Sequence, residues 1–232
     1  MRSVRLPILA LIASAVMSFQ SAVFAVGHQN PEVIELYTSA KVSKADQVYV
    51  GSDEKVAPHG VDGMKSVSLE RGQSLPVLDI HVGGEISISD DNIVKKPWSS
   101  KSFESKGKVQ LVQYVAASPG AARQNKPFND TLIEKQFSSE QLSTTVIVHT
   151  ADTMAFVKGI VTKKLAKNKV KHQTIDFVVD DNGVGLQRWG MKHKSNAVIV
   201  LDAGGKVLFA KDGPLSEIEI ESTIKLIEKQ MS

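Results

Sequence analysis

The sequence contains no cysteine among its 232 residues. Without thiols the chain cannot form a disulfide, present a thiolate nucleophile or bind a metal through sulfur. Thiol–disulfide exchange and thiol-based peroxidase chemistry are therefore excluded. A domain of about 150 residues buries roughly 68–70% of its unfolded surface, so this chain is long enough to fold without disulfides or a structural metal.

Aromatic residues are scarce and the charge is nearly balanced. The chain has three Tyr, two Trp and eight Phe, and its net charge is +3. The lysines are spread along the sequence instead of alternating with aromatic residues. Nucleic-acid surfaces normally combine clustered basic residues with aromatic ones, so we expect no nucleic-acid partner.

No apolar run is long enough for a typical transmembrane helix. Arg2 and Arg5 precede the apolar run LPILALIASAVMSF, and small residues close the segment at Ala25. This pattern predicts a signal peptide over residues 1–25, with cleavage before Val26. A membrane anchor needs about 20 continuous apolar residues, so we expect no stable anchor after cleavage. The exported chain would then carry 26 basic and 25 acidic residues, a net charge of +1.

Residues 26–68 differ from the rest of the chain because they are rich in Lys, Ser, Asp and Gly. Their strand-like runs, VIELY and QVYV, are too short to build a core. We predict a polar N-terminal extension that is partly ordered. It could add edge strands to the main sheet or form a flexible arm, and edge-strand pairing could also serve a partner.

Residues 69–232 alternate strand-like and helix-like patterns, which predicts one α/β domain. LPVLDIHVGGEISI is interpreted as a hairpin with its turn at Gly83-Gly84, because glycine adopts positive φ readily. VQLVQYVAA is apolar throughout, as expected for a strand covered on both faces. A helix is predicted to open at Pro127.

The alternation continues to the C-terminus. TTVIVHT and IDFVVDD are predicted strands, GLQRWGM a short helix, and NAVIVLDAGGKVLFAKDG a hairpin. Ser216 and Glu219 match a capping box at the start of the final helix. Apolar positions at helical spacing define the buried faces of the last two long helices: Met154, Val157, Ile160, Val161 and Leu165 in the first, and Ile218, Ile220, Ile224 and Ile227 in the second.

This element order predicts a three-layer sandwich in which helices flank a central mixed sheet. Crossover helices connect parallel strands, whereas the last two strands are joined by a tight turn and must be antiparallel. A thioredoxin-like architecture fits this order best. A flavodoxin-like doubly wound sheet is the alternative.

The chain resembles the YtfJ family of exported bacterial proteins. The similarity is carried by the region from Val67 to the C-terminus, including the runs TTVIVHTAD, VVDDNGV and SNAVIVLDAGGKVLFAKDG. The resemblance implies a thioredoxin-like fold and a location in the periplasm of a Gram-negative bacterium. The family's function is unassigned, so the resemblance implies no reaction.

In redox-active proteins of this fold, the loop after the central strand presents a thiol at a helix N-terminus. Here that loop contains Ser118, Pro119 and Gly120, and Asn196-Ala197 stands where the partner proline is expected. We predict that Ser118 caps a helical turn begun by Pro119. The exposed N–H groups of the turn are the alternative, as a binding site for an anion.

His149 and Asp152 follow the next predicted strand and complete the candidate binding loop. Ligands of α/β sheets gather at the carboxyl ends of strands. Ser118, His149 and Asp152 could in principle act as nucleophile, base and orienting group, or hold a metal. However, Asp152 is also a natural helix N-cap, and a histidine at a strand end is usually just solvated.

Two further polar clusters are interpreted as structural. The run Asp180-Asp181-Asn182-Gly183 lacks the spacing of a calcium loop and is predicted to be a plain turn. Lys192-His193-Lys194 is predicted to be a solvated face. We therefore assign no catalytic residue, metal or cofactor. The sequence favours a non-catalytic module that binds a periplasmic protein, peptide or small ligand. The alternative is a cysteine-independent hydrolase or metal-assisted enzyme.

Overall fold

The computed structural model describes residues 69–90 and 92–231. The predicted signal peptide and the predicted polar extension lie outside the described residues. Within the described part of the chain, no helix combines the length and the apolar character needed to cross a membrane.

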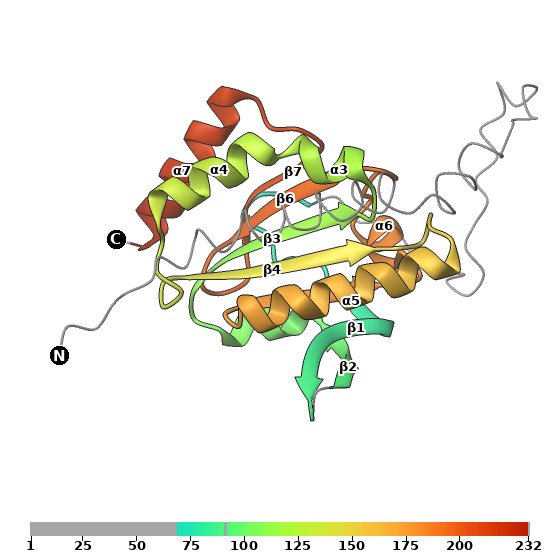
Figure 1. The fold of residues 1–232 in the computed structure, drawn as a ribbon. Coiled ribbons are helices and arrows are strands. Elements are labelled where there is room, and N and C mark those ends of the chain that lie inside the picture. Colours follow the sequence, from blue (N-terminus) through green and yellow to red (C-terminus); the bar gives the residue numbers. More distant parts are fainter. Residues whose placement is uncertain (1–68, 91, 232) are drawn as a thin grey trace, which may run out of the picture.

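Seven strands form one mixed sheet in the order β2-β1-β5-β4-β3-β6-β7 (Figure 1). β3, β4 and β5 are parallel, whereas β1 is antiparallel to β5, β6 to β3, and β7 to β6. All eight residues of β3 are buried, as its apolar sequence predicted for a central strand. The strands are β1 (Asp79–Ser89), β2 (Asn92–Ser99), β3 (Val109–Ala116), β4 (Leu142–His149), β5 (Ile175–Asp180), β6 (Asn196–Leu201) and β7 (Val207–Asp212).

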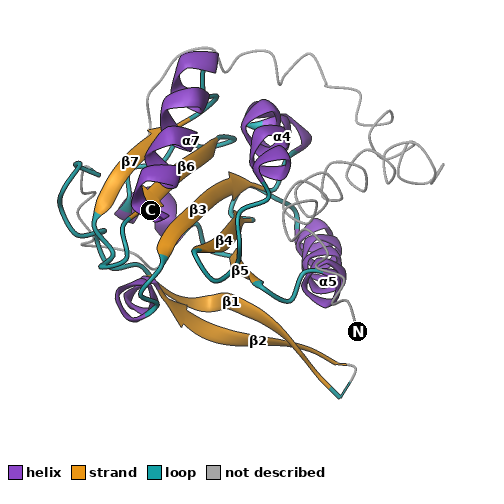
Figure 2. Ribbon diagram, turned by 90° about the vertical axis from the view of Figure 1, so that its left-hand side faces the viewer, coloured by secondary structure: helices purple, strands orange, loops and turns teal. Residues whose placement is uncertain are grey.

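Helices cover both faces of the sheet. Residues of α4, α5 and α7 share one apolar cluster on the first face (Figure 2). A second cluster packs η2 and α6 against the other face. The helices are η2 (Ser100–Ser105, a 3-10 helix), α3 (Pro119–Gln124), α4 (Lys126–Lys135), α5 (Ala155–Lys171), α6 (Val184–Arg188) and α7 (Glu217–Met231).

The prediction of a hairpin turn at Gly83-Gly84 is wrong. Both glycines lie inside β1, at an irregularity in its pairing with β2, and their φ values are +102° and +92°. A Cβ on Gly83 would overlap the carbonyl oxygen of Val179, and one on Gly84 the carbonyl oxygen of Lys96. Glycine is required at both positions because β5 approaches the backbone at Gly83 and β2 approaches it at Gly84. Close approach of a neighbouring strand, and not only a turn, therefore calls for glycine.

The chain reverses after β1 near Asp90, which has a φ of +48°. The following strand, β2, forms an antiparallel edge with β1. Its sequence, NIVKKPWS, has two lysines and a proline and was not predicted as a strand. These residues are typical of an edge strand, where the missing N–H of proline and the lysine charges are tolerated.

Two apolar positions assigned to buried helix faces are in fact exposed. Met154 is the N-cap of α5 and is 58% exposed, while Ile218 in the first turn of α7 is 79% exposed. The other assigned positions of α7 are buried, as are Val161 and Leu165 of α5. The helical spacing of apolar residues therefore identified the buried face of each helix correctly. The predicted face was one turn too long at its N-terminal end.

The predicted C-terminal hairpin and capping box are confirmed. β6 and β7 form a hairpin whose turn is stabilised by Asp202, which accepts hydrogen bonds from the N–H groups of Gly204 and Lys206. Ser216 and Glu219 form the predicted capping box, with the Ser216 N–H donating to the Glu219 carboxylate at 2.7 Å.

The connectivity confirms a thioredoxin-like architecture. β3 and β4, with the helices between them, form a βαβ unit. After β5 the chain continues into the β6–β7 hairpin and the final helix, α7. β6 lies antiparallel beside the central strand β3. The flavodoxin-like alternative is wrong, since a doubly wound sheet would place a parallel strand at that position.

Candidate functional site

The candidate site lies at the edge of the sheet where the parallel strands end. β3, β4 and β5 end there at Ala116, His149 and Asp180, while β6 begins and β7 ends at the same edge, at Asn196 and Asp212. Loops from five strands therefore meet at one place, as is usual for binding sites in α/β sheets.

Ser118 caps α3, as predicted. Its backbone is extended, and its Oγ accepts a hydrogen bond from the N–H of Ala121 at 3.2 Å, with Pro119 as the first helical residue. The hydroxyl thus satisfies a backbone donor at the position where a redox-active relative would present sulfur. Gly120 has open space around its Cα. The loop is built as a helix cap and carries no activated nucleophile.

His149 is a buried residue and not a solvated one. Its ring stacks on Tyr114, with centroids 5.3 Å apart and an interplanar angle of 12°. Neither ring nitrogen has a hydrogen-bond partner in the described part of the chain. Burial lowers the pKa of His149 because the imidazolium loses hydration, so the ring is neutral near pH 7.

Tyr114 and Asp180 form the centre of the buried polar network. The Tyr114 hydroxyl donates to Asp180 at 2.9 Å, and the same carboxylate accepts from the N–H groups of Val184 and Gly185. Burial, together with the charge of Asp180, raises the pKa of Tyr114 well above its usual value. Asp180 therefore anchors α6 to the sheet, a role that the sequence prediction of a plain turn missed.

Asp152 has a partner that the sequence did not indicate. Both of its carboxylate oxygens lie 2.9 Å from Nδ1 of His193. The prediction that Asp152 caps α5 is wrong, because the N-cap is Met154 and it makes no side-chain capping bond. Asp152 and His193 are 41 residues apart, so only the folded chain brings them together.

Asn196 and Ala197 occupy the place expected for a proline and act as connectors. The Asn196 N–H donates to the side chain of Gln124 at 3.0 Å, and its Nδ2 donates to the carbonyl of Ala121. Ala197 pairs with Tyr114 of β3. No peptide bond among the described residues is cis. This segment holds α3 against β6.

The three residues of the enzyme alternative do not form a catalytic relay. Ser118 is bonded to Ala121, Asp152 to His193, and the His149 ring to neither of them. A nucleophile needs its base within about 2.6–3.2 Å. Across residues 69–90 and 92–231, no group of three or more His, Asp or Glu side chains could hold a metal ion.

The exposed rim of this edge combines apolar and polar groups. Met154 and Phe156 are 58% and 48% exposed, and they lie two and four residues after Asp152 in the chain. We call Asp152, His193, Met154 and Phe156 the strand-end rim. Methionine and aromatic residues are enriched in protein interfaces, and here they lie close in the chain to Asp152, which bonds to His193.

Fold and site together define a thioredoxin-like protein without a thiol redox centre. The chain belongs to the family described as "Bacterial protein of unknown function (YtfJ_HI0045)", whose model matches residues 69–230. The resemblance seen in the sequence is thereby confirmed. Since the chain has no cysteine, it is not a thiol–disulfide oxidoreductase.

Two relatives agree with the family assignment. The chain is 32% identical over 160 residues to the Escherichia coli K12 "Uncharacterized protein YtfJ", and the match covers 69% of this chain and 86% of that protein. A Haemophilus influenzae protein matches with the same identity and coverage. A solved structure of a putative thiol:disulfide interchange protein DsbE from Chlorobium tepidum matches with 18% identity and a TM-score of 0.47, over 71% of this chain and 99% of that one.

Proposed function

We propose that this protein is an exported, non-catalytic binding module that engages a periplasmic protein or peptide through the strand-end rim. The observation that carries the proposal is the exposure of Met154 and Phe156 beside the Asp152–His193 pair. Exposure of two large apolar side chains to water is unfavourable. Their burial against a partner lowers the free energy. The pair next to them offers a hydrogen-bonding anchor for a peptide.

The absence of chemistry at the same edge supports binding over catalysis. The thiol position is a helix cap, and the buried Tyr114 hydroxyl and Asp180 carboxylate stabilise the fold by bonding to each other. The periplasmic location rests on the leader pattern of residues 1–25 and is part of the proposal.

The test places a photo-crosslinking amino acid at position 156 of the full chain in living cells. Position 218 is the matched control, because Ile218 is an exposed apolar residue on α7, outside the rim. We expect one defined protein or peptide to be crosslinked from 156 and not from 218. Equal crosslinking from both positions, or none from either, would contradict the proposed function.

A second experiment tests the compartment separately. Residues 1–25 are fused to a reporter that is active only after export, and the N-terminus of the recovered full chain is determined by mass spectrometry. We expect an active reporter and an N-terminus at Val26. A chain that retains Met1 in the cytoplasmic fraction would refute export but leave the rim itself untouched.

A further inference from the structure

Three exposed lysines on the outward face of α5 have no ion-pair partner in the described part of the chain. α5 contains six lysines and no Asp or Glu over 17 residues. Lys158 donates to the carbonyl of Asp181, and Lys169 donates to backbone carbonyls at the start of β5. Lys163, Lys167 and Lys171 are exposed, and in the described part of the chain none of these three is bonded to a carboxylate.

The spacing of these three lysines is unfavourable for the helix itself. They recur every four residues, so each lies directly above the next on one face. Like charges at this spacing destabilise a helix, whereas α4 and α7 use the same spacing for the ion pairs Lys126–Asp130 and Lys225–Glu221. Nothing within the fold explains why α5 should differ.

The neighbouring ionisable groups respond to this concentration of charge. Burial, and to a smaller extent the charge of the nearby Lys167, lower the pKa of Lys164 to about 8. Burial also lowers the pKa of His172, with Lys171 acting in the same direction. The closest carboxylate along the chain, Asp176 of β5, is bonded to Lys106 at 2.6 Å and forms a second ion pair, at 3.6 Å, with Lys169 of α5.

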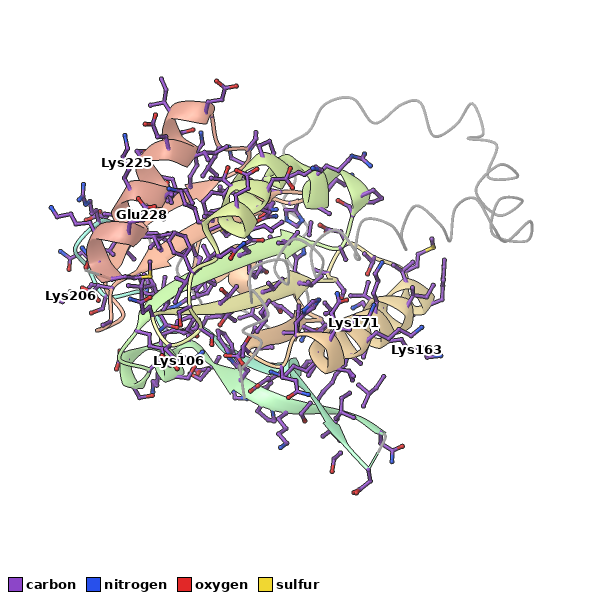
Figure 3. The ribbon with its side chains drawn as sticks, turned by 60° about the vertical axis from the view of Figure 1, so that its left-hand side comes forward. Lys106, Lys163, Lys171, Lys206, Lys225 and Glu228 are labelled. Carbon is purple, nitrogen blue, oxygen red and sulfur yellow. The ribbon has the colours of Figure 1, made fainter. Side chains whose placement is uncertain are left out.

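An apolar residue lies among the lysines. Val170 is 59% exposed and stands between Lys167 and Lys171 in the last turns of α5. Figure 3 shows Lys163 and Lys171 on α5, on the side of the molecule remote from α7, where Lys225 and Glu228 lie. We define the α5 basic face as Lys163, Lys167, Val170 and Lys171. It is separate from the strand-end rim, which lies at the opposite end of α5.

We propose that the α5 basic face docks the protein onto an anionic phospholipid surface. Three unbalanced lysines on one helical face complement a layer of lipid phosphates, and an exposed valine can enter the headgroup region. The absence of arginine from α5 argues against an acidic protein as the partner, because protein interfaces are enriched in arginine and depleted of lysine. Flexible lysine stems suit a fluid layer of headgroups.

The experiment uses the exported chain, whose N-terminus is determined by mass spectrometry. It measures co-sedimentation of this chain with phosphatidylcholine vesicles that contain or lack phosphatidylglycerol. We expect binding only to the anionic vesicles, and a steep loss of binding as salt increases. In the triple variant Lys163→Gln, Lys167→Gln, Lys171→Gln we expect the affinity to fall about 100-fold, since each lysine near such a surface contributes about fivefold.

A charge-matched control separates the face from net charge alone. The variant Lys101→Gln, Lys206→Gln, Lys229→Gln removes three exposed lysines from other surfaces. We expect its affinity to fall less than threefold, and both triple variants to keep the wild-type circular dichroism spectrum. Equal losses in the two variants, equal binding to neutral vesicles, or no binding would overturn the proposal. Binding of poly-glutamate but not of vesicles would overturn it too, by assigning the face to an acidic protein.

Discussion

The strand-end edge has an interior and a rim that use polar groups in opposite ways. In the interior, Tyr114, His149 and Asp180 are buried, and the phenol and carboxylate bond to each other and to backbone N–H groups. At the rim, Asp152 and His193 bond to each other at the surface, beside exposed apolar residues. The interior fixes the fold, whereas the rim is exposed, as the proposed binding function requires. Substitutions inside should therefore change stability, and substitutions at the rim should change binding.

The largest expected effect is that of Gly185→Ala. A Cβ at this position would overlap the ring of Tyr114, which is held between His149 and the Asp180 carboxylate. Overpacking of this kind typically costs 1–3 kcal/mol, and we expect about 3 kcal/mol in the free energy of unfolding, measured by urea denaturation. Gly159→Ala is the control, since that glycine lies in α5 with open space around it. It should stabilise the protein by about 0.5–1 kcal/mol. If the two variants unfold alike, the interior is not tightly packed.

Tyr114→Phe should have the next largest effect. It keeps the ring stacked on His149 and removes the hydroxyl that donates to Asp180. We expect a loss of about 1–2 kcal/mol, because a buried charged acceptor loses one donor and keeps two backbone N–H groups. The midpoint of thermal unfolding measures it. An unchanged midpoint would show that the carboxylate does not depend on this bond.

Stability should fall as the pH is lowered from about 7 to 5. The folded-state pKa of His149 is lowered by burial, so below the unfolded value of about 6.5 the unfolded chain binds more protons than the folded one. His172 is shifted in the same direction. One such group contributes at most about 1.4 kcal/mol per pH unit.

The variant His149→Phe should flatten this pH dependence. Phenylalanine keeps an aromatic ring against Tyr114 but does not titrate, whereas the control His193→Gln changes an exposed histidine. The measurement is the unfolding free energy at several pH values. A slope that is equally steep in His149→Phe and in the wild type would exclude His149 as its source.

The smallest effect on stability is expected at the rim. Asp152→Ala should lower the unfolding free energy by no more than about 1 kcal/mol, because exposed ion pairs contribute little. Yields of the crosslink from position 156 should nevertheless drop, since the polar anchor is lost. A stability loss as large as that of Gly185→Ala would mean that rim and interior form one structural unit.

The prediction from sequence was most accurate where local chemistry decides the structure. The Ser118 cap, the Ser216–Glu219 capping box and the Asp202 turn all depend on residues two to four positions apart. Such interactions form within one turn of backbone, so the sequence pattern contains both partners. The same applies to β3, whose continuous apolar run identified it as the central strand.

The prediction failed where the role of a residue depends on a contact with a residue far away in the sequence. Gly83 and Gly84 suggested a turn, but carbonyls of two other strands explain them. Asp180 looked like a turn residue, yet it bonds a tyrosine 66 positions earlier. Asp152 looked like a cap, although its partner is His193. In each case the local interpretation was reasonable, but a contact with a residue distant in the sequence determined the actual role.

By itself the amino-acid sequence determined that no thiol chemistry is possible, that helices and strands alternate, and that α5 bears six lysines without an acid. Composition and short-range spacing are properties of the chain alone. Only the tertiary structure decided that His149 is buried against Tyr114, that Asp152 meets His193, and that three of those lysines share an outer face. These are properties of sheet order and helix packing, because the strand register sets which distant residues become neighbours.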